Sequence, residues 1–257
     1  IWQALQEGRS GIHRIETVDV TGFKFQNGAE VPNFRPTDYF EEKTAALLDR
    51  FAQFSVIAAR EAVRDSGVEW TAENRELTAV VTGSCVGGQL AEDAGYVDLF
   101  LEKRNRVSPL TIPKTMANAG ASHISLEFGT TGPAFTISTA CSSANHAIGH
   151  ALWMVRNGLV DRAITGGGEA PFGTGFLRAW EAMRVVSPDT CRPFSKDRRG
   201  MIIGEGAGMM VLETLEAAQA RGARIYAELV GFGMSADAHH ITQPSVDGPA
   251  RAIRMAL

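Results

Sequence analysis

One stretch constrains this chain more than any other, because a short strand turns there directly into an amphipathic helix around a single cysteine. Residues 133–137 start with proline and continue with apolar, aromatic and β-branched residues, which predicts a strand. From Ala144 onward, apolar residues recur at i, i+3, i+4, i+7, i+8 and i+11, and Asn157-Gly158 is a typical helix end. Cys141 is therefore expected where the strand becomes the helix.

This position suits a nucleophile. A thiol at a helix N-terminus meets the positive end of the macrodipole and several unpaired backbone N–H groups, which favour the thiolate. The small neighbours Ala140, Ser142 and Ser143 permit a tight turn, whose N–H groups can hold an oxyanion during acyl transfer. The turn is similar in design to the one that presents the serine of many hydrolases. The alternative is a small apolar residue of the core, which is the commoner role of a single cysteine.

Several motifs give the chain a family resemblance. Residues 138–144 (Ser-Thr-Ala-Cys-Ser-Ser-Ala) resemble the active-site signature of β-ketoacyl-(acyl carrier protein) synthases of type II, the nodulation type among them. Gly204-Glu205-Gly206-Ala207-Gly208 is similar to the second signature of that family. Further matching stretches are residues 163–170, 192–198 and 225–237. In order, the matches cover nearly the whole chain.

The alternation of strands and helices predicts an α/β fold. Strands are expected over residues 77–82, 133–137, 162–165, 201–212 and 224–234, and helices over residues 44–65, 89–102, 113–128, 144–156, 174–184, 215–221 and 248–257. The resemblance implies the thiolase-like layered fold (helix–sheet–helix–sheet–helix) of two similar halves. Residues 1–223 would form the N-terminal half with the nucleophile, and residues 224–257 the start of the second half.

The resemblance also implies the reaction, a decarboxylative Claisen condensation in the elongation of fatty acids or related acyl chains. Cys141 would hold the acyl group as a thioester, and malonyl-acyl carrier protein would lose carbon dioxide and attack it. Acyl carrier protein is then the expected partner, and a homodimer the expected assembly. The phosphopantetheine arm belongs to the carrier protein, so the chain is expected to need neither a cofactor nor a metal.

Four residues are expected to contact the acyl group. The resemblance puts Val86 at the gate of the acyl pocket and Met116 near the acyl pocket of a second subunit. Trp180 would wall the acyl tunnel, and Met201 stands where many relatives have Phe. An ordinary core position remains the alternative for Met116 and for Trp180. Because Met201 and Trp180 depart from the common pattern, the acyl chain length stays open.

The basic turn at residues 103–106 offers Arg104 and Arg106 as contacts for an acidic carrier protein, although such a run is often only solvated surface. The net charge of −4 argues against a general nucleic-acid binder. No apolar run approaches the roughly 18 residues that a membrane span needs. The spacing of the three cysteines predicts neither a disulfide framework nor a zinc site, and residues 83–88 lack the pattern of a P-loop. We therefore expect a cytoplasmic protein.

Two histidine motifs (His-Gly-Thr and Gly-His) and a Gly-Phe-Gly-Gly loop, which complete the family's site, do not occur in this sequence. None of the six histidines present is forced toward Cys141, and we interpret all six as structural. The printed chain alone is therefore expected not to condense malonyl units, and both ends suggest a partial sequence. Alternatives are a thiolase or another acyltransferase of the same fold, a non-catalytic synthase-like partner, and a specialised synthase.

Overall fold

The computed structural model describes residues 1–257, which form two compact units built from interleaved segments. The first unit comprises Ile1–Ile57, Val86–Gly120 and Gly168–Gly208. The second comprises Ala58–Cys85, Ala121–Gly167 and Met209–Leu257. The expected boundary between residues 223 and 224 concerns a division into halves and stays a prediction.

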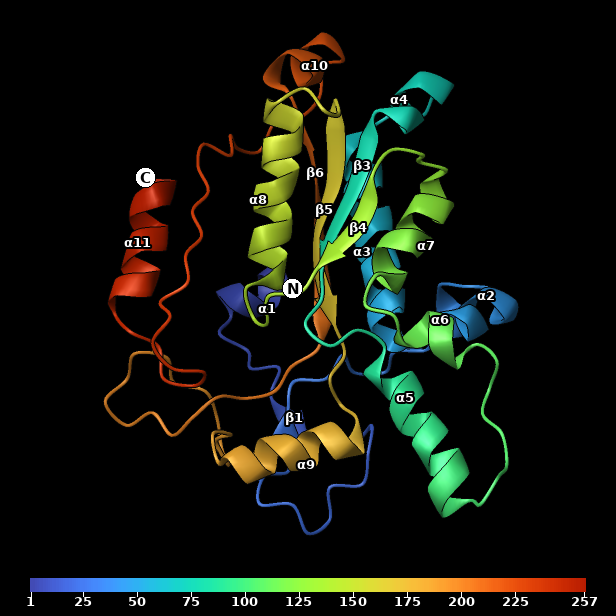
Figure 1. Cartoon of the computed structure of the whole chain (residues 1–257), viewed down its shortest axis with the longest axis vertical. Coiled ribbons are helices and arrows are strands. Elements are labelled where there is room, and N and C mark those ends of the chain that lie inside the picture. Colours follow the sequence, from blue (N-terminus) through green and yellow to red (C-terminus); the bar gives the residue numbers. More distant parts are fainter. The chain divides into compact units, whose positions relative to one another are not determined.

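The second unit is built on a four-stranded sheet in the order β4-β3-β5-β6 (Figure 1). Its strands are β3 (Thr78–Gly83), β4 (Ala134–Ile137), β5 (Arg162–Glu169) and β6 (Gly206–Glu213), of which β5 and β6 each have one end in the first unit. Strand β3 runs parallel to both β4 and β5, with Gly83 opposite Ile137 and Gly167. Helix α8 (Ser143–Arg156) packs on β3 and β4. This arrangement confirms the predicted α/β class.

The core of the second unit explains why these elements form. Every residue of β3 is buried, as is usual for a central strand of a parallel sheet. Helix α8 contacts the sheet through a stripe of small apolar residues, so that helix and sheet approach closely. This cluster consists of Ala79, Val81, Ala147, Ala151, Val155, Val160 and Ala163. The spacing that predicted the helix is therefore the spacing of its buried face.

Further helices complete the second unit. They are α4 (Ala72–Glu76), the greater part of α7 (Ala119–Phe128), α10 (Leu215–Ala220) and α11 (Asp247–Ala256). Thr71 and Asn74 form a reciprocal cap at the start of α4. The ion pair between Arg60 and Glu127 (2.7 Å) joins the end of α3 to α7.

The first unit combines an antiparallel strand pair with short helices. Its elements are α1 (Trp2–Gln6), β1 (His13–Arg14), β2 (Asn27–Gly28), η1 (Pro36–Asp38), α2 (Glu42–Leu47), the start of α3 (Arg50–Ser66), α5 (Gln89–Tyr96), the π-helical turn η2 (Val97–Leu101), α6 (Thr111–Thr115) and α9 (Thr174–Met183). Its apolar cluster is Ile15, Val20, Phe23, Phe25, Phe172, Leu177 and Ile203. No helix of the chain combines the length and the apolar character that crossing a membrane would take.

The single helix expected over residues 44–65 is wrong, because Leu48 and Asp49 separate α2 from α3. Leu48 is extended, and the Asp49 carboxylate accepts hydrogen bonds from the N–H groups of Phe51 (3.3 Å) and Ala91 (2.8 Å). Burial raises the pKa of Asp49, an effect that these hydrogen bonds oppose. Asp49 thus caps α3 and also binds the first turn of α5, a contact between distant residues that periodicity does not reveal.

The helix expected over residues 113–128 is also divided, into α6 and α7. Met116 takes an extended conformation (φ −61°, ψ 128°) directly after α6. The carbonyl of Thr115 accepts a hydrogen bond from the N–H of Gly88 (3.2 Å). A tertiary contact with the glycine-rich turn therefore accompanies the break, and the alanine-rich sequence alone does not mark it.

Two strand predictions also need correction. Of residues 201–212, only those from Gly206 onward form β6, because Met201 pairs instead with Val186 in an isolated bridge. Residues 224–234 form no strand, since no other strand of the chain pairs with them. Their Phe232 packs against His146 and Trp153 of α8.

Candidate active site

Cys141 lies in the turn that links β4 to α8 in the second unit, and its side chain is exposed. Ala140 before it adopts a left-handed conformation with φ 53°, which costs an L-residue about 1–2 kcal/mol. Ser142 after it is the N-cap residue of α8. Strain of this kind persists only where the surrounding contacts hold it, and it is common at reactive turns.

Hydroxyl groups supply those contacts. The Ser142 hydroxyl donates to the carbonyl of Thr139 (2.7 Å), and the Ser143 hydroxyl donates to the carbonyl of Ala140 (2.6 Å). The N–H of Thr139 donates in turn to the Ser143 hydroxyl oxygen (2.9 Å). The N–H of Cys141 donates to no group of the chain. The turn therefore presents an exposed thiol beside an available N–H donor.

Two glycines let the start of α8 approach the sheet. A methyl group on Gly83, the last residue of β3, would overlap the backbone of Ser143. A methyl group on Gly167 of β5 would come within 2.7 Å of the Ala144 methyl carbon. Neither position has room for a larger residue, and the close approach sets the position of the Cys141 turn. The sequence alone does not reveal this role of Gly83, because the contact joins residues far apart in the chain.

The histidines take part in other contacts. His146 packs edge-on against Phe232, and His150 packs against Trp153. His13 faces the Glu30 carboxylate at 3.5 Å, and burial lowers the pKa of His123. His146, His150 and His13 thus contact groups other than Cys141, and the structural role of all six histidines stays a prediction.

The four expected acyl contacts belong to the first unit, and the structure brings two of them together. Trp180 and Met201 both pack, partly buried, against the apolar cluster around Phe172. Val86 is half-buried in the glycine-rich turn, whereas Met116 is 48% exposed, which is not the position of a core residue.

The two expected carrier-protein contacts, also in the first unit, differ in their charge environment. Arg104 forms ion pairs with Asp98 (3.2 Å) and Glu102 (2.5 Å), which largely neutralise its charge. Arg106 is exposed and forms no ion pair. Of the two arginines, Arg106 therefore has the guanidinium group that is available to an acidic protein surface.

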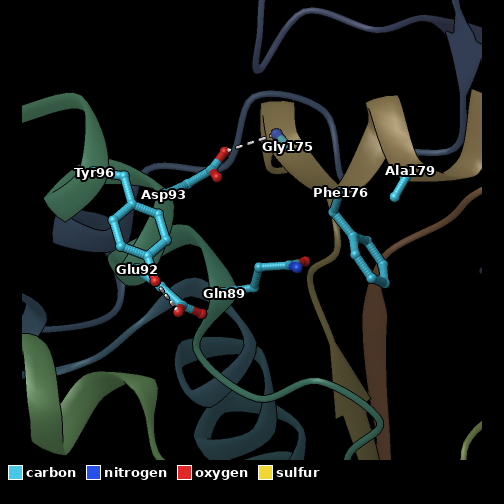
Figure 2. Close-up of a pocket in the computed structure, with 7 residues that line it drawn as sticks. All are labelled: Gln89, Glu92, Asp93, Tyr96, Gly175, Phe176 and Ala179. Carbon is cyan, nitrogen blue, oxygen red and sulfur yellow. Dashed lines mark hydrogen bonds between the residues drawn. The ribbon is translucent and has the colours of Figure 1, made fainter. Parts of the chain in front are cut away.

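A pocket of about 290 Å³ lies between α5 and α9 in the first unit (Figure 2). It is lined by Gln89, Glu92, Asp93, Tyr96, Gly175, Phe176 and Ala179. The Tyr96 hydroxyl donates to Glu92 (2.8 Å), which raises the pKa of Tyr96. The N–H of Gly175 donates to Asp93 (3.4 Å), while the buried Oε1 of Gln89 has no donor. No motif in the sequence marks this pocket.

The second family signature contributes a buried ion pair in the first unit. Glu205, whose side chain is 0% exposed, accepts hydrogen bonds from Nε (2.8 Å) and Nη2 (2.6 Å) of Arg50 and from the N–H of Val31 (2.8 Å). The Arg50 guanidinium lies 5.0 Å from the ring centroids of both Phe34 and Phe54. With its acceptor capacity used internally, Glu205 acts as a structural residue. No group of three or more metal-ligating side chains occurs anywhere in the chain.

Comparison with known proteins agrees with this geometry. The family model described as "Beta-ketoacyl synthase, N-terminal domain" matches residues 1–218. Nodulation protein E of Rhizobium sp. (strain N33) is 44% identical over 257 residues, covering 100% of this chain and 64% of the relative. 3-Oxoacyl-[acyl-carrier-protein] synthase 2 of Vibrio harveyi is 42% identical over 260 residues, covering 99% of this chain and 63% of the relative.

A solved structure, "The ishigamide ketosynthase/chain length factor", superimposes with a TM-score of 0.92 and 35% identity. The match covers 99% of this chain and 64% of that one, and it confirms the predicted thiolase-like fold. The chain thus spans slightly less than two thirds of the length of the proteins it matches. Since the family model covers most of its residues, the chain belongs to the β-ketoacyl synthase family.

Proposed function

We propose that Cys141 accepts an acyl group from acyl carrier protein, as the first step of β-ketoacyl synthesis. The observation that carries the proposal is the strained turn after β4, which exposes the thiol and leaves the Cys141 N–H without an internal acceptor. Membership of the β-ketoacyl synthase family supports the same step.

In this step the Cys141 thiolate attacks the carbonyl carbon of the acyl thioester. The new bond from sulfur to carbon forms as the carbonyl oxygen becomes an oxyanion, which the N–H of Cys141 holds by a hydrogen bond. The oxyanion then collapses, and the bond to the phosphopantetheine sulfur breaks. The carrier leaves as a thiolate, which takes up a proton from water, and the acyl group remains on Cys141.

Decarboxylative condensation with malonyl-acyl carrier protein is proposed for the whole protein. That step needs groups that stabilise an enolate oxyanion, and the two histidine motifs that the resemblance implies do not occur in residues 1–257. The name of the Vibrio harveyi relative supports both the reaction and the carrier protein. The proposed process is the elongation of fatty acids or related acyl chains in the cytoplasm. The phosphopantetheine arm of the carrier protein is the only cofactor that this proposal requires.

The remaining contacts form part of the same proposal. Val86, Met116, Trp180 and Met201 would contact the acyl group. Exposed and unpaired, Arg106 is the stronger carrier-protein contact, with Arg104 beside it.

A homodimer is proposed as the assembly. Strand β4 lies at the edge of the four-stranded sheet, so its outer backbone groups have no partner strand within the chain. Pairing with the same strand of a second copy would satisfy these groups.

The test is the intact mass of the protein after incubation with a long-chain acyl carrier protein. We expect one acyl adduct on the unaltered chain and none on the Cys141→Ala variant. Cys191→Ala, which removes another exposed thiol, is the matched control and should keep the adduct. A folded chain without any adduct would overturn the proposal.

The same experiment separates the alternatives. An adduct from acyl-coenzyme A but none from acyl carrier protein would indicate a thiolase or another acyltransferase. Absence of an adduct from either donor would indicate a non-catalytic, synthase-like partner.

A further inference from the structure

A second exposed thiol, Cys85, lies at the same end of the sheet as Cys141. Cys85 follows β3, and Cys141 follows the neighbouring parallel strand β4. Carboxyl ends of parallel strands meet at one edge of a sheet, so both thiols belong to this edge. Both cysteines also belong to the second unit.

Hydrogen bonds keep the two turns side by side beyond the strands. Gly83 stands opposite Ile137, and the N–H of Ser84 donates to the Ile137 carbonyl (3.2 Å). The Ser138 hydroxyl then donates to the carbonyl of Cys85 (3.2 Å). Continuing this register places Cys85 opposite Thr139, which is itself bridged to Cys141.

A second contact bounds the separation from the other side. The backbone of Ser143, two residues after Cys141, touches Gly83, two residues before Cys85. Two residues span at most about 7 Å, so each cysteine lies within that reach of the contact. A disulfide needs Cα atoms about 4.4–6.8 Å apart, a distance that these two short turns allow.

We propose that Cys85 is the resolving thiol of Cys141, and that a hydroperoxide links the two in a reversible disulfide. The Cys141 thiolate attacks the peroxide, which breaks the O–O bond and leaves a sulfenic acid on Cys141 and a hydroxide or alkoxide ion. The Cys85 thiolate then attacks the sulfenic sulfur, and hydroxide leaves and is protonated to water. The peroxide is the oxidant, and a thiol reductant restores both cysteines by exchange.

The disulfide would prevent the Cys141 thiol from reacting while the oxidant is present. Without a resolving thiol, an exposed sulfenic acid is oxidised further to sulfinic and sulfonic acids, which thiol reductants do not reverse. Cys85 would therefore preserve Cys141 in a recoverable form.

The first test treats the protein with hydrogen peroxide and maps its peptides without reduction. We expect a cross-linked peptide pair containing Cys85 and Cys141, full recovery of both thiols on reduction, and an intact mass lower by two hydrogens. In Cys85→Ser, Cys141 should instead gain two or three oxygens irreversibly. Cys191→Ser, the matched control, should cross-link like the unaltered chain. Absence of the cross-link, or equal over-oxidation with and without Cys85, would overturn the proposal.

A second test measures proximity without oxidation. Phenylarsine oxide bridges two neighbouring thiols. One adduct is therefore expected on the unaltered chain and on the Cys191→Ser variant. The Cys85→Ser and Cys141→Ser variants should retain no adduct after dialysis. If Cys85→Ser does not fold, judged by circular dichroism, Cys85→Ala takes its place. Retention of the arsenical by Cys85→Ser would contradict the pairing.

These measurements are independent of the proposed acyl transfer. A chain that forms the cross-link but is never acylated would overturn the acyl-transfer step and leave the thiol pair standing. A chain that is acylated at Cys141 but never cross-links would do the reverse.

Discussion

Two polar regions of this molecule are built in opposite ways. The turn around Cys141 in the second unit is exposed and uncharged, and the hydroxyls of Ser142 and Ser143 hold it in place. The Arg50–Glu205 pair in the first unit is charged and buried, and its hydrogen bonds are made inside the protein. Each region contains a family signature, yet only the first leaves groups available to a substrate.

The difference lies in how the two signatures use their hydrogen-bonding groups. A buried charge must be paired. The Glu205 carboxylate therefore accepts hydrogen bonds from Val31 and Arg50, which join the glycine-rich segment to these residues. An exposed turn has no such requirement, and its internal hydrogen bonds leave the Cys141 N–H unused. Burial and hydrogen bonding thus distinguish two motifs that look equally prominent in the sequence.

The largest predicted effect removes one partner of the buried pair. Arg50→Met leaves the Glu205 carboxylate buried without its cation, which should lower the free energy of unfolding by about 3–5 kcal/mol. Denaturant titration measures this change in the free energy of unfolding. Adding Glu205→Gln should recover much of the loss, because the amide oxygen can still accept from Val31.

The matched control is Arg60→Met, which breaks the more exposed pair with Glu127. That variant should lose less than about 1 kcal/mol, since solvent screens such pairs. Equal losses for Arg50→Met and Arg60→Met would remove the contrast between the buried and the exposed region.

An intermediate effect is predicted for the contact beneath the Cys141 turn. The methyl group of Gly83→Ala would overlap the Ser143 backbone, so the variant should lose about 3 kcal/mol of stability and should be acylated more slowly. Thermal unfolding and the acylation rate measure both effects. Gly208→Ala is the matched control, because no atom lies within 4 Å of the added methyl. If Gly83→Ala had unchanged stability and an unchanged acylation rate, the Cys141 turn would not depend on the close approach of Gly83 to the Ser143 backbone.

Much of the fold could be predicted from local pattern. The helix after Cys141 can be predicted because its buried face repeats along the sequence, and β3 because it is a short run of small apolar and β-branched residues. The breaks at Leu48 and Met116 were not predicted, because contacts with the distant residues Ala91 and Gly88 accompany them. Such contacts leave no periodic signal.

The candidate site divides along the same line. The position of Cys141 between strand and helix could be predicted, because these elements are adjacent in the sequence. The close approach at Gly83 and the position of Cys85 beside Ser138 could not, because they depend on the register of β3 beside β4. The composition of residues 224–234 suits a strand, whereas a strand also needs a neighbouring strand, and composition does not show whether one is present.

The smallest predicted effect tests whether strain in the Cys141 turn serves the reaction. Ala140→Gly should raise stability by about 0.5–1 kcal/mol, because glycine removes a left-handed strain of about 1–2 kcal/mol and adds about 0.5–1 kcal/mol of backbone entropy cost. The acylation rate should fall, because the more flexible turn no longer holds the Cys141 thiol and N–H in one arrangement. The decrease should be smaller than the roughly 100-fold that a misplacement of about 1 Å costs. Thermal unfolding and acylation kinetics measure the two changes.

Ala238→Gly is the matched control for this variant, since Ala238 has the same residue type and a similar φ (51°) in an exposed loop of the second unit. It should gain similar stability and keep the acylation rate. If both variants are acylated at the unaltered rate, the strain at Ala140 has no part in positioning the thiol, and the Cys141 turn differs from the buried pair only in exposure. If only Ala140→Gly slows, stability has been given up at this turn in return for a defined position of the nucleophile.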